Sequence, residues 1–348
     1  MNSPWQEFLE KHNAVVDQDR ITSFGPSGQP YPGTQDTCVC ELTQLGLIRV
    51  TGEEAHTFLH SQFTNDLTQV TDHTSQLSSY CNPKGRVLSI FRIFKRDGDY
   101  YLVLPKDVID LTLKKLTMFK LRAQVELQDA SEQLTLFGVA GPKVQPALES
   151  INVVLPQTEN DCIQVDGTVM IRLPSENIRV LFIADAKAAT TICKQLCEQL
   201  PLVTSRLWDL HDISCGVPQV TAHTSETFTP QMINLELIDG VSFSKGCYPG
   251  QEVVARTHYL GKPNRRMYRA SITTKQAIQS GTNIFSAEDD AQALGKVVVS
   301  QLVSAKQANA LIVLRTQKVD ESNLHIASTD GPAVSLKTLP YSLGSGAT

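Results

Sequence analysis

One octapeptide, Lys245 to Glu252 with the sequence KGCYPGQE, constrains this chain more than any other stretch. Its two glycines lie within five residues, and glycine allows a positive φ and a close approach of backbone to a ligand. Pro249-Gly250 is a turn signal, and the residues that follow are typical of the first turn of a helix. The sequence therefore predicts a tight turn that holds Cys247 just ahead of a helix N-terminus.

Two features of this turn favour a reactive cysteine. A helix N-terminus and a nearby cation, here Lys245, both favour the thiolate form of Cys247. A free cysteine is more commonly a buried, inert core residue, and that role is the alternative.

The charge around the octapeptide differs from that of the chain. Between residues 245 and 266 five cations accompany one carboxylate, Glu252, whereas the whole chain has a net charge of −5. A local basic patch on an acidic protein indicates an anionic ligand or partner. A solvated helix end is the alternative that charge alone leaves open. The five cations are Lys245, Arg256, Lys262, Arg265 and Arg266.

Length and composition narrow the class of protein. The 348 residues are enough for two or three domains, and 41% hydrophobic with 19% charged residues is typical of a soluble globular protein. A sequence pI of about 5.9 argues against general nucleic-acid binding. The first residues lack a signal-peptide pattern, and no apolar run reaches membrane-spanning length. We therefore expect a cytoplasmic protein with reduced thiols.

The cysteines and histidines show no metal-binding pattern. None of the eight cysteines forms a CxxC pair, and the eight histidines lack metal spacing. Cys38 with Cys40, and Cys193 with Cys197, are expected to pack in the interior. The sequence predicts no metal site.

The order of elements predicts a mixed α+β chain. An N-terminal helix (3–16, with Trp5, Phe8 and Leu9 as its apolar face) precedes a linker at 22–34 that is too rich in Gly and Pro for regular structure. Residues 134–199 follow a β-α-β-β-α order, typical of a ferredoxin-like subdomain. After residue 266, short alternating strands predict a small barrel. Other expected helices are 55–63, 106–121, 205–215 and a short one at 232–237, and other expected strands are 38–50 with a break near 44–46, 76–81, 86–94 and 100–104.

Three further residues are candidates for a site. Asp66, after Asn65 at the end of an early helix, is a candidate carboxylate, although an exposed turn residue is the commoner role. Trp208 can stack on an aromatic ligand or belong to the core. His258 lies near Cys247 in the sequence, and a Cys–His nucleophilic pair depends on geometry that sequence does not give.

The octapeptide resembles the signature of the YgfZ family, the bacterial relatives of the mitochondrial iron–sulfur assembly factor Iba. The usual form is Lys-Gly-Cys-Tyr-x-Gly-Gln-Glu, and every fixed position is present. The resemblance covers most of the chain from about residue 36. Its supporting stretches are 50–52, 66, 84–86, 228–231, 234–235, 254–256, 261–262, 265–266 and 339–343.

The resemblance implies a fold similar to the T-protein (aminomethyltransferase) of the glycine cleavage system, a three-domain cloverleaf around a central hole. By that similarity, a discontinuous folate-binding domain covers 36–130 and 205–264, and a ferredoxin-like domain covers 131–204. A C-terminal β-barrel covers 265–343, after an N-terminal helix and linker at 1–35. The implied ligand is tetrahydrofolate or a one-carbon-substituted folate.

The resemblance also implies roles for residues. Cys247 and Asp66 would be the catalytic pair, Asp66 falling where T-protein relatives keep an aspartate near the reactive folate nitrogens. Trp208 matches a tryptophan of the folate site, and the second family aromatic falls on Leu45, a departure that weakens stacking at that wall. The other implied cofactor-binding residues are Lys245, Tyr248, Gln251, Glu252 and Arg256.

The implied biology is maintenance of iron–sulfur enzymes, such as tRNA methylthiotransferases, by a cytoplasmic monomer that contacts neither membrane nor nucleic acid directly. Whether the chain turns over a substrate stays open; as an enzyme it would be a folate-dependent one-carbon transferase of the aminomethyl or formyl type. Two alternatives are a true aminomethyltransferase and a redox sensor acting through Cys247. One cysteine cannot hold a cluster that normally needs four ligands, so any cluster contact would be transient or shared with a partner.

Overall fold

The computed structural model describes residues 3–17, 20–25, 33–261, 263–287, 292–318 and 323–343. The chain divides into two compact units. The first comprises Met1–Phe58, Leu67–Gln76 and Phe91–His211, and the second comprises Leu59–Asp66, Leu77–Ile90 and Asp212–Thr348. Within the described ranges, no helix has the length and apolar character needed to cross a membrane.

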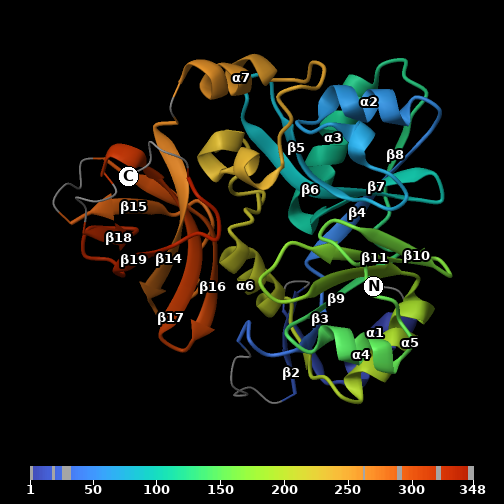
Figure 1. The fold of residues 1–348 in the computed structure, drawn as a ribbon. Helices are drawn as coiled ribbons and strands as arrows, with labels where there is room; N and C mark the ends of the chain where they lie inside the picture. The colour runs from blue at the N-terminus through green and yellow to red at the C-terminus, as the bar shows by residue number, and fades with distance from the viewer. Residues whose placement is uncertain are drawn as a thin grey trace. The chain divides into compact units, whose positions relative to one another are not determined.

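A six-stranded sheet forms the centre of the first unit (Figure 1). Its pairs are antiparallel except for the last, in which β13 runs parallel to β3. Every residue of β9 is buried, because both faces of the sheet are covered. The strand order is β10 (Cys162–Val165), β11 (Thr168–Leu173), β12 (Arg179–Ala184), β9 (Thr135–Ala140), β3 (Cys38–Glu41) and β13 (Leu202–Val203).

Helices cover one face of this sheet. Phe137 and Val139 alternate toward that face, where they share a core with Trp5 and Phe8 of the N-terminal helix. Asp185 caps α5 by accepting hydrogen bonds from two backbone N–H groups of its first turn. The covering helices are α1 (Ser3–Lys11), α4 (Val144–Ser150) and α5 (Ala186–Cys197).

A second core lies on the other face of the same sheet. There Leu136, Ile171 and Leu181 pack with residues of a second sheet and with Trp208 of α6 (Arg206–Cys215). Within the first unit this second sheet comprises the end of β6 (Val87–Arg96), β7 (Asp99–Pro105), β4 (Leu45–Thr51) and β8 (Glu126–Asp129). The remaining elements of the unit are β1 (Ala14–Asp17), β2 (Arg20–Phe24), the start of α2 (Ala55–Gln62), η1 (Leu67–Gln69), η2 (Lys106–Val108) and α3 (Ile109–Lys120).

The second unit contains a barrel. Its six strands run in the order β18-β15-β16-β17-β14-β19, and a bridge between His325 and Ala333, the residue before β19, joins the two ends. The interior holds alternate residues such as Ala270, Ile272 and Ile312. The strands are β14 (Arg265–Thr273), β15 (Asn283–Ser286), β16 (Gly295–Ser304), β17 (Gln307–Arg315), β18 (Leu324–Ile326) and β19 (Val334–Lys337), with η5 (Thr316–Lys318) after β17.

The outer face of the barrel packs against the segments that carry the octapeptide. Met267, Leu311 and Val313 share a core with Ile233 and Val254. This core also includes the hairpin of β5 (Gln76–Cys81) and the start of β6, and the turns η3 (Pro230–Ile233) and η4 (Leu235–Ile238). Helix α7 (Gln251–Leu260) is thereby attached to the barrel wall through Val254.

The predicted α+β class and the C-terminal barrel are confirmed. The N-terminal helix was predicted too long: it ends at Lys11, because Asn13 takes a left-handed φ of 57° and the β-branched Val15 and Val16 follow in a strand. The start of the predicted linker is also wrong, since Thr22–Phe24 belong to β2; residues 26–32 lie outside the described residues. The predicted helix at 232–237 is two 3₁₀ turns separated by a left-handed Asn234. The domain boundaries stay a prediction.

Candidate functional site

The turn of the octapeptide is fixed by its second glycine. Gly250 has a φ of 80° and precedes the first residue of α7. A Cβ there would lie 2.5 Å from the carbonyl oxygen of Asn82 and 2.6 Å from the amide nitrogen of Gly85. The predicted turn and helix are confirmed, and the close approach of Gly250 is to the β5–β6 turn of its own chain.

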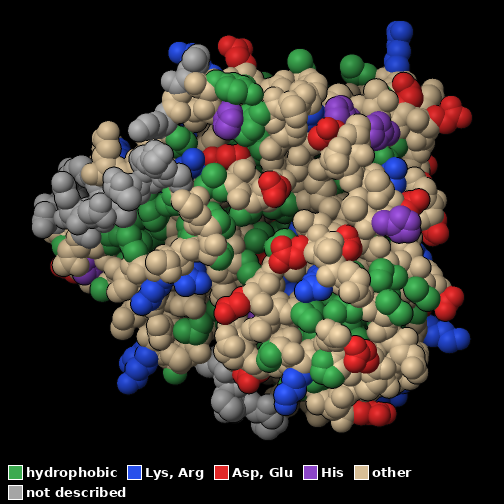
Figure 2. Space-filling model, viewed as in Figure 1, with side chains coloured by type: hydrophobic (Ala, Val, Ile, Leu, Met, Phe, Trp, Pro, Cys, Tyr) green, Lys and Arg blue, Asp and Glu red, His purple; other side chains and the backbone are tan. Residues whose placement is uncertain are grey.

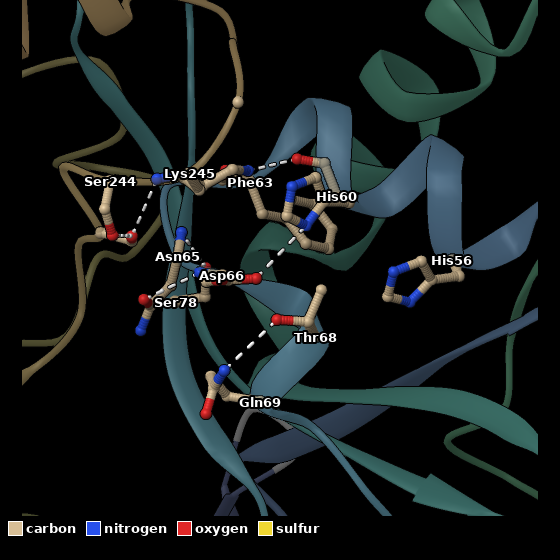
Figure 3. Close-up of polar contacts among 12 residues, drawn as sticks. His56, His60, Phe63, Asn65, Asp66, Thr68, Gln69, Ser78, Ser244 and Lys245 are labelled. Atoms are coloured by element: carbon tan, nitrogen blue, oxygen red, sulfur yellow. Dashed lines mark hydrogen bonds and ion pairs between the residues drawn. The ribbon is translucent and has the colours of Figure 1, made fainter.

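Lys245 anchors the start of this loop on the end of α2 (Figure 3). Its Nζ donates to the carbonyl oxygens of His60 and, at 2.6 Å, Phe63. Carbonyls at a helix C-terminus lack helical partners and carry the negative end of the helix dipole, so a cation is favourable there. The side chain is buried, and burial lowers the pKa of Lys245 to about 8, against the opposing effects of Asp66 and Cys247. Sequence analysis assigned Lys245 to a ligand; its donors are used here on the protein's own backbone.

Buried polar residues after α2 join three segments of the second unit. The Thr64 hydroxyl donates to the carbonyl of Gly240 at 2.9 Å, and the Ser242 amide donates to the carbonyl of Thr64 at 3.0 Å. The Asn65 amide group donates to the carbonyls of Leu77 and Asp239, at 2.9 and 2.6 Å. The bonds to Asp239, Gly240 and Ser242 reduce the freedom of the segment that leads to Cys247.

Asn65 also positions the candidate carboxylate. Its Oδ1 accepts a hydrogen bond of 2.9 Å from the backbone N–H of Asp66, whose side chain is partly exposed. Asp66 Oδ1 lies 3.7 Å from Nδ1 of His60, and its negative charge acts on Lys245 (Figure 3). A partly exposed carboxylate near an imidazole and an ammonium group can accept a proton or orient a ligand N–H.

Cys247 is the exposed cysteine of this chain. All eight cysteines are described, and five are buried, two are half-buried and Cys247 alone is exposed. Burial raises the pKa of the Cys81 thiol to about 12, so Cys81 is a protonated core residue at neutral pH. The ring of Tyr248 lies beside Lys245, with Nζ 5.3 Å from its centroid, and burial followed by the nearby Cys81 raises the pKa of Tyr248. The accessible thiol thus stands beside the buried Tyr248 and two positions after the anchored Lys245.

Helix α7 presents aromatic and apolar side chains beside this loop. The ring of Phe243 stacks on His258 with centroids 3.7 Å apart, and Tyr259 meets both rings edge-on. Tyr259 and Val253 are 66% and 40% exposed, and Figure 2 shows hydrophobic side chains together with a histidine over α7. The stacking of Phe243 on His258 ties the segment before the octapeptide loop to helix α7, which follows the loop.

The remaining octapeptide residues and the predicted basic patch have different surroundings. Gln251 Nε2 is 3.5 Å from the carbonyl of Gly246, while Glu252 and Arg256 are exposed. Arg266 is buried and pairs with Glu236, so Lys245 and Arg266 both serve the fold. Lys262 lies outside the described residues. Among the described cations, Arg256 and the half-buried Arg265 stay available to a ligand.

The two predicted wall residues, Trp208 and Leu45, belong to a core of the first unit. They are 2% and 9% exposed. Trp208 packs on Gly138, where a Cβ would lie 2.2 Å from its Cζ3, and the Arg179 guanidinium carbon is 4.8 Å from its ring centroid. The structure thus gives Trp208 the core role, and contact of either residue with folate stays a prediction.

Two buried side chains beside these residues each carry one polar atom without a hydrogen-bond partner among the described residues. Gln44, the neighbour of Leu45, is 6% exposed and its Oε1 accepts no hydrogen bond. His211, one turn after Trp208, is 3% exposed and its Nε2 has no partner. Burial, followed by Arg179, lowers the pKa of His211 to about 4, so its ring is neutral at pH 7. Buried polar atoms without partners are costly, and a polar ligand would satisfy them.

Sequence reasoning missed Gln44, Asn65 and His211. Gln44 and His211 carry no motif of their own, although each stands within three positions of a residue that the family resemblance selected. Asn65 was noted only as the neighbour of Asp66. Three of its four hydrogen bonds depend on residues 12 or more positions away, Leu77, Ser78 and Asp239.

Comparisons with known proteins agree with the resemblance. Residues 34–169 match the GCVT N-terminal domain family. The chain is 31% identical to the tRNA-modifying protein YgfZ of Colwellia psychrerythraea over 308 residues, 88% of this chain and 94% of that protein. It is 30% identical to the YgfZ protein of Vibrio vulnificus over 310 residues, 88% and 93% of the two chains. The glycine cleavage system aminomethyltransferase T of Bartonella henselae shares the fold, with a TM-score of 0.73 and 14% identity over 98% of this chain and 97% of that chain.

We predict a pH-dependent stability that originates from Lys245. Its pKa is 10.5 in the unfolded chain and about 8 in the fold, so between these values the unfolded state binds more protons and stability rises with pH. Wild type should gain stability relative to Lys245→Met as pH rises from 8 to 10.5, at most about 1.4 kcal/mol per pH unit. Urea unfolding of both proteins across this range measures the difference. Lys84→Met, at an exposed lysine, controls for loss of a surface amine; a pH-independent difference between wild type and Lys245→Met would contradict the assignment.

Proposed function

The chain belongs to the YgfZ family, and on that premise we propose that it is a tetrahydrofolate-binding accessory protein for the assembly or repair of iron–sulfur enzymes, including enzymes that modify tRNA. The observation that carries the proposal is the exposure of Cys247 in a loop whose flanks are anchored. Structural cysteines are normally buried, so a thiol presented this way favours chemistry with a partner.

Each unit, taken by itself, carries polar groups that suit a folate. A pterin ring carries N–H donors and a carbonyl acceptor, and the buried Gln44 Oε1 and His211 Nε2 offer an acceptor and a ring nitrogen without partners among the described residues. The partly exposed carboxylate of Asp66 can accept an N–H from a ligand. Bound tetrahydrofolate would supply a one-carbon carrier, and the chain's own part is to hold and orient it.

The working roles follow from these positions. Asp66, fixed through Asn65, would hold a proton or orient a folate nitrogen, with Lys245 balancing its charge and His60 beside it. Cys247 would act on a partner protein, since its side chain is accessible while its backbone is restrained. The printed name of the relatives, tRNA-modifying protein, supports clients among the enzymes that modify tRNA.

Folate binding is tested by calorimetric titration with tetrahydrofolate. We expect saturable binding that weakens roughly five-fold in Gln44→Leu and in His211→Leu, because one neutral hydrogen bond contributes about 1 kcal/mol. Gln145→Leu, at an exposed glutamine of α4, is the control and should bind as wild type does. Absence of wild-type binding would remove folate from the proposal, and unchanged affinity in both variants would remove this pair of contacts.

The role of Cys247 is tested in cells that lack the native copy of this protein. Expression of wild type should restore the methylthio-modified nucleosides of tRNA, and Cys247→Ser should reduce them at least about ten-fold, as expected when a reactive group is removed. Cys215→Ser alters a half-buried cysteine of the same unit and should restore them fully. Full restoration by Cys247→Ser at equal protein level would refute a functional thiol.

A further inference from the structure

Two arginines face each other where the barrel strands β14 and β17 pair. Arg265 is the first residue of β14 and Arg315 the last of β17, and they are direct partners in the antiparallel register. Like charges placed directly opposite destabilise a sheet. Both side chains are half-buried, and neither guanidinium forms an ion pair or hydrogen bond with another described residue. The described residues of the barrel therefore leave this unfavourable pair without a neutralising partner.

Arg86 is a third guanidinium held toward the same place. Its Nη1 donates to the carbonyl of Thr227 at 2.8 Å and lies 3.8 Å from Sδ of Met232. Met232 belongs to η3, which contacts the start of β14, where Nη1 of Arg266 donates to the carbonyl of Gln231 at 2.9 Å. Arg86 and the beginning of β14 thus both contact the same short turn.

The electrostatics agree with this geometry. Burial lowers the pKa of Arg265, and the positive charges of Arg315 and then Arg86 lower it further. The carboxylate on η4, Glu236, is committed to Arg266. The positive charges of Arg315 and Arg86 therefore act on Arg265, which pairs with no carboxylate of the described residues.

We propose that Arg86, Arg265 and Arg315 bind the phosphate monoester of a ligand. Guanidinium groups donate in a planar fork that suits phosphate oxygens bidentately. A terminal phosphate offers three oxygens and up to two negative charges, which suits three neighbouring cations. A planar carboxylate offers two oxygens and one charge, which a single guanidinium can satisfy.

The site lies next to the octapeptide loop in the second unit. Arg86 directly follows Gly85, whose amide nitrogen is in the tight contact with Gly250 at the start of α7. A ligand held by its phosphate at Arg86 would be anchored beside the helix that follows Cys247.

Inorganic phosphate, added to the full-length protein at constant ionic strength, is the first probe. We expect it to raise the thermal midpoint of wild type and to bind at least about ten-fold more weakly to Arg315→Gln, which removes charge-assisted bonds. In phosphate-free buffer Arg315→Gln should unfold at a higher temperature than wild type, because a repulsion is lost. Arg269→Gln, on the same strand but bonded to the carbonyl of Ser214, is the control and should respond to phosphate as wild type does.

A second variant keeps the test decisive if Arg315→Gln does not fold. Arg315→Lys retains the charge but lacks the planar fork, so it should fold and still bind phosphate more weakly than wild type. Equal phosphate responses of wild type and Arg315→Lys would overturn the site, as would a wild-type response no greater than that to chloride.

Two further ligands identify the anion. An oligoribonucleotide with a 5′-phosphate should bind through the three arginines, and the same oligonucleotide with a 5′-hydroxyl should not. Equal binding of both would mean that the site binds the RNA backbone and not a phosphate monoester. If pteroyl-triglutamate binds through Arg315 and phosphate has no effect, the ligand group of this site is a carboxylate and the phosphate proposal is wrong. Tetrahydrofolate monoglutamate should bind Arg315→Gln normally, so failure here leaves the proposed function testable by itself.

Discussion

The ammonium group of Lys245 on the last carbonyls of α2 is the contact on which the candidate site depends. The protein interior would otherwise disfavour this ammonium charge. At the end of α2, however, backbone carbonyl oxygens without helical partners accept its hydrogen bonds. The same contact sets the start of the loop that carries Cys247. Gly250 fixes the other end, because a side chain there would collide with the β5–β6 turn. A thiol on a loop pinned at both ends can be accessible without being mobile.

Buried polar residues extend this restraint to the candidate carboxylate. Thr64 and Asn65 form hydrogen bonds with two other segments of the chain, residues 77–79 and 239–242. Such bonds add little net stability one by one, but leaving any of them unmade is expensive. Their collective effect is therefore to specify one arrangement, in which Asp66 stands beside His60 and within electrostatic reach of Lys245.

The sequence predicts local structure well where a local pattern determines it. Pro249-Gly250 predicts the turn, and the alternation of apolar and polar residues after residue 266 predicts the barrel; the structure contains both. The use of Lys245 is not predictable in this way, because its acceptor on His60 is 185 positions away and is a backbone oxygen. The N-terminal helix was overextended because Val15 continues an apolar pattern that the left-handed Asn13 interrupts. Patterns of residue types identify elements, whereas the partners of buried charges depend on the whole fold.

The central claim, that Lys245 holds the Cys247 loop in place, is tested most directly by amide hydrogen exchange of wild type and Lys245→Met below pH 8, where this amine is charged. Exchange reports local opening segment by segment. The account predicts faster exchange in Lys245→Met for residues 243–250 and for the last turn of α2, with the barrel strands β14 and β17 unchanged. Identical exchange of the loop in both proteins would contradict it, since the loop would then be held by contacts other than the Lys245 anchor.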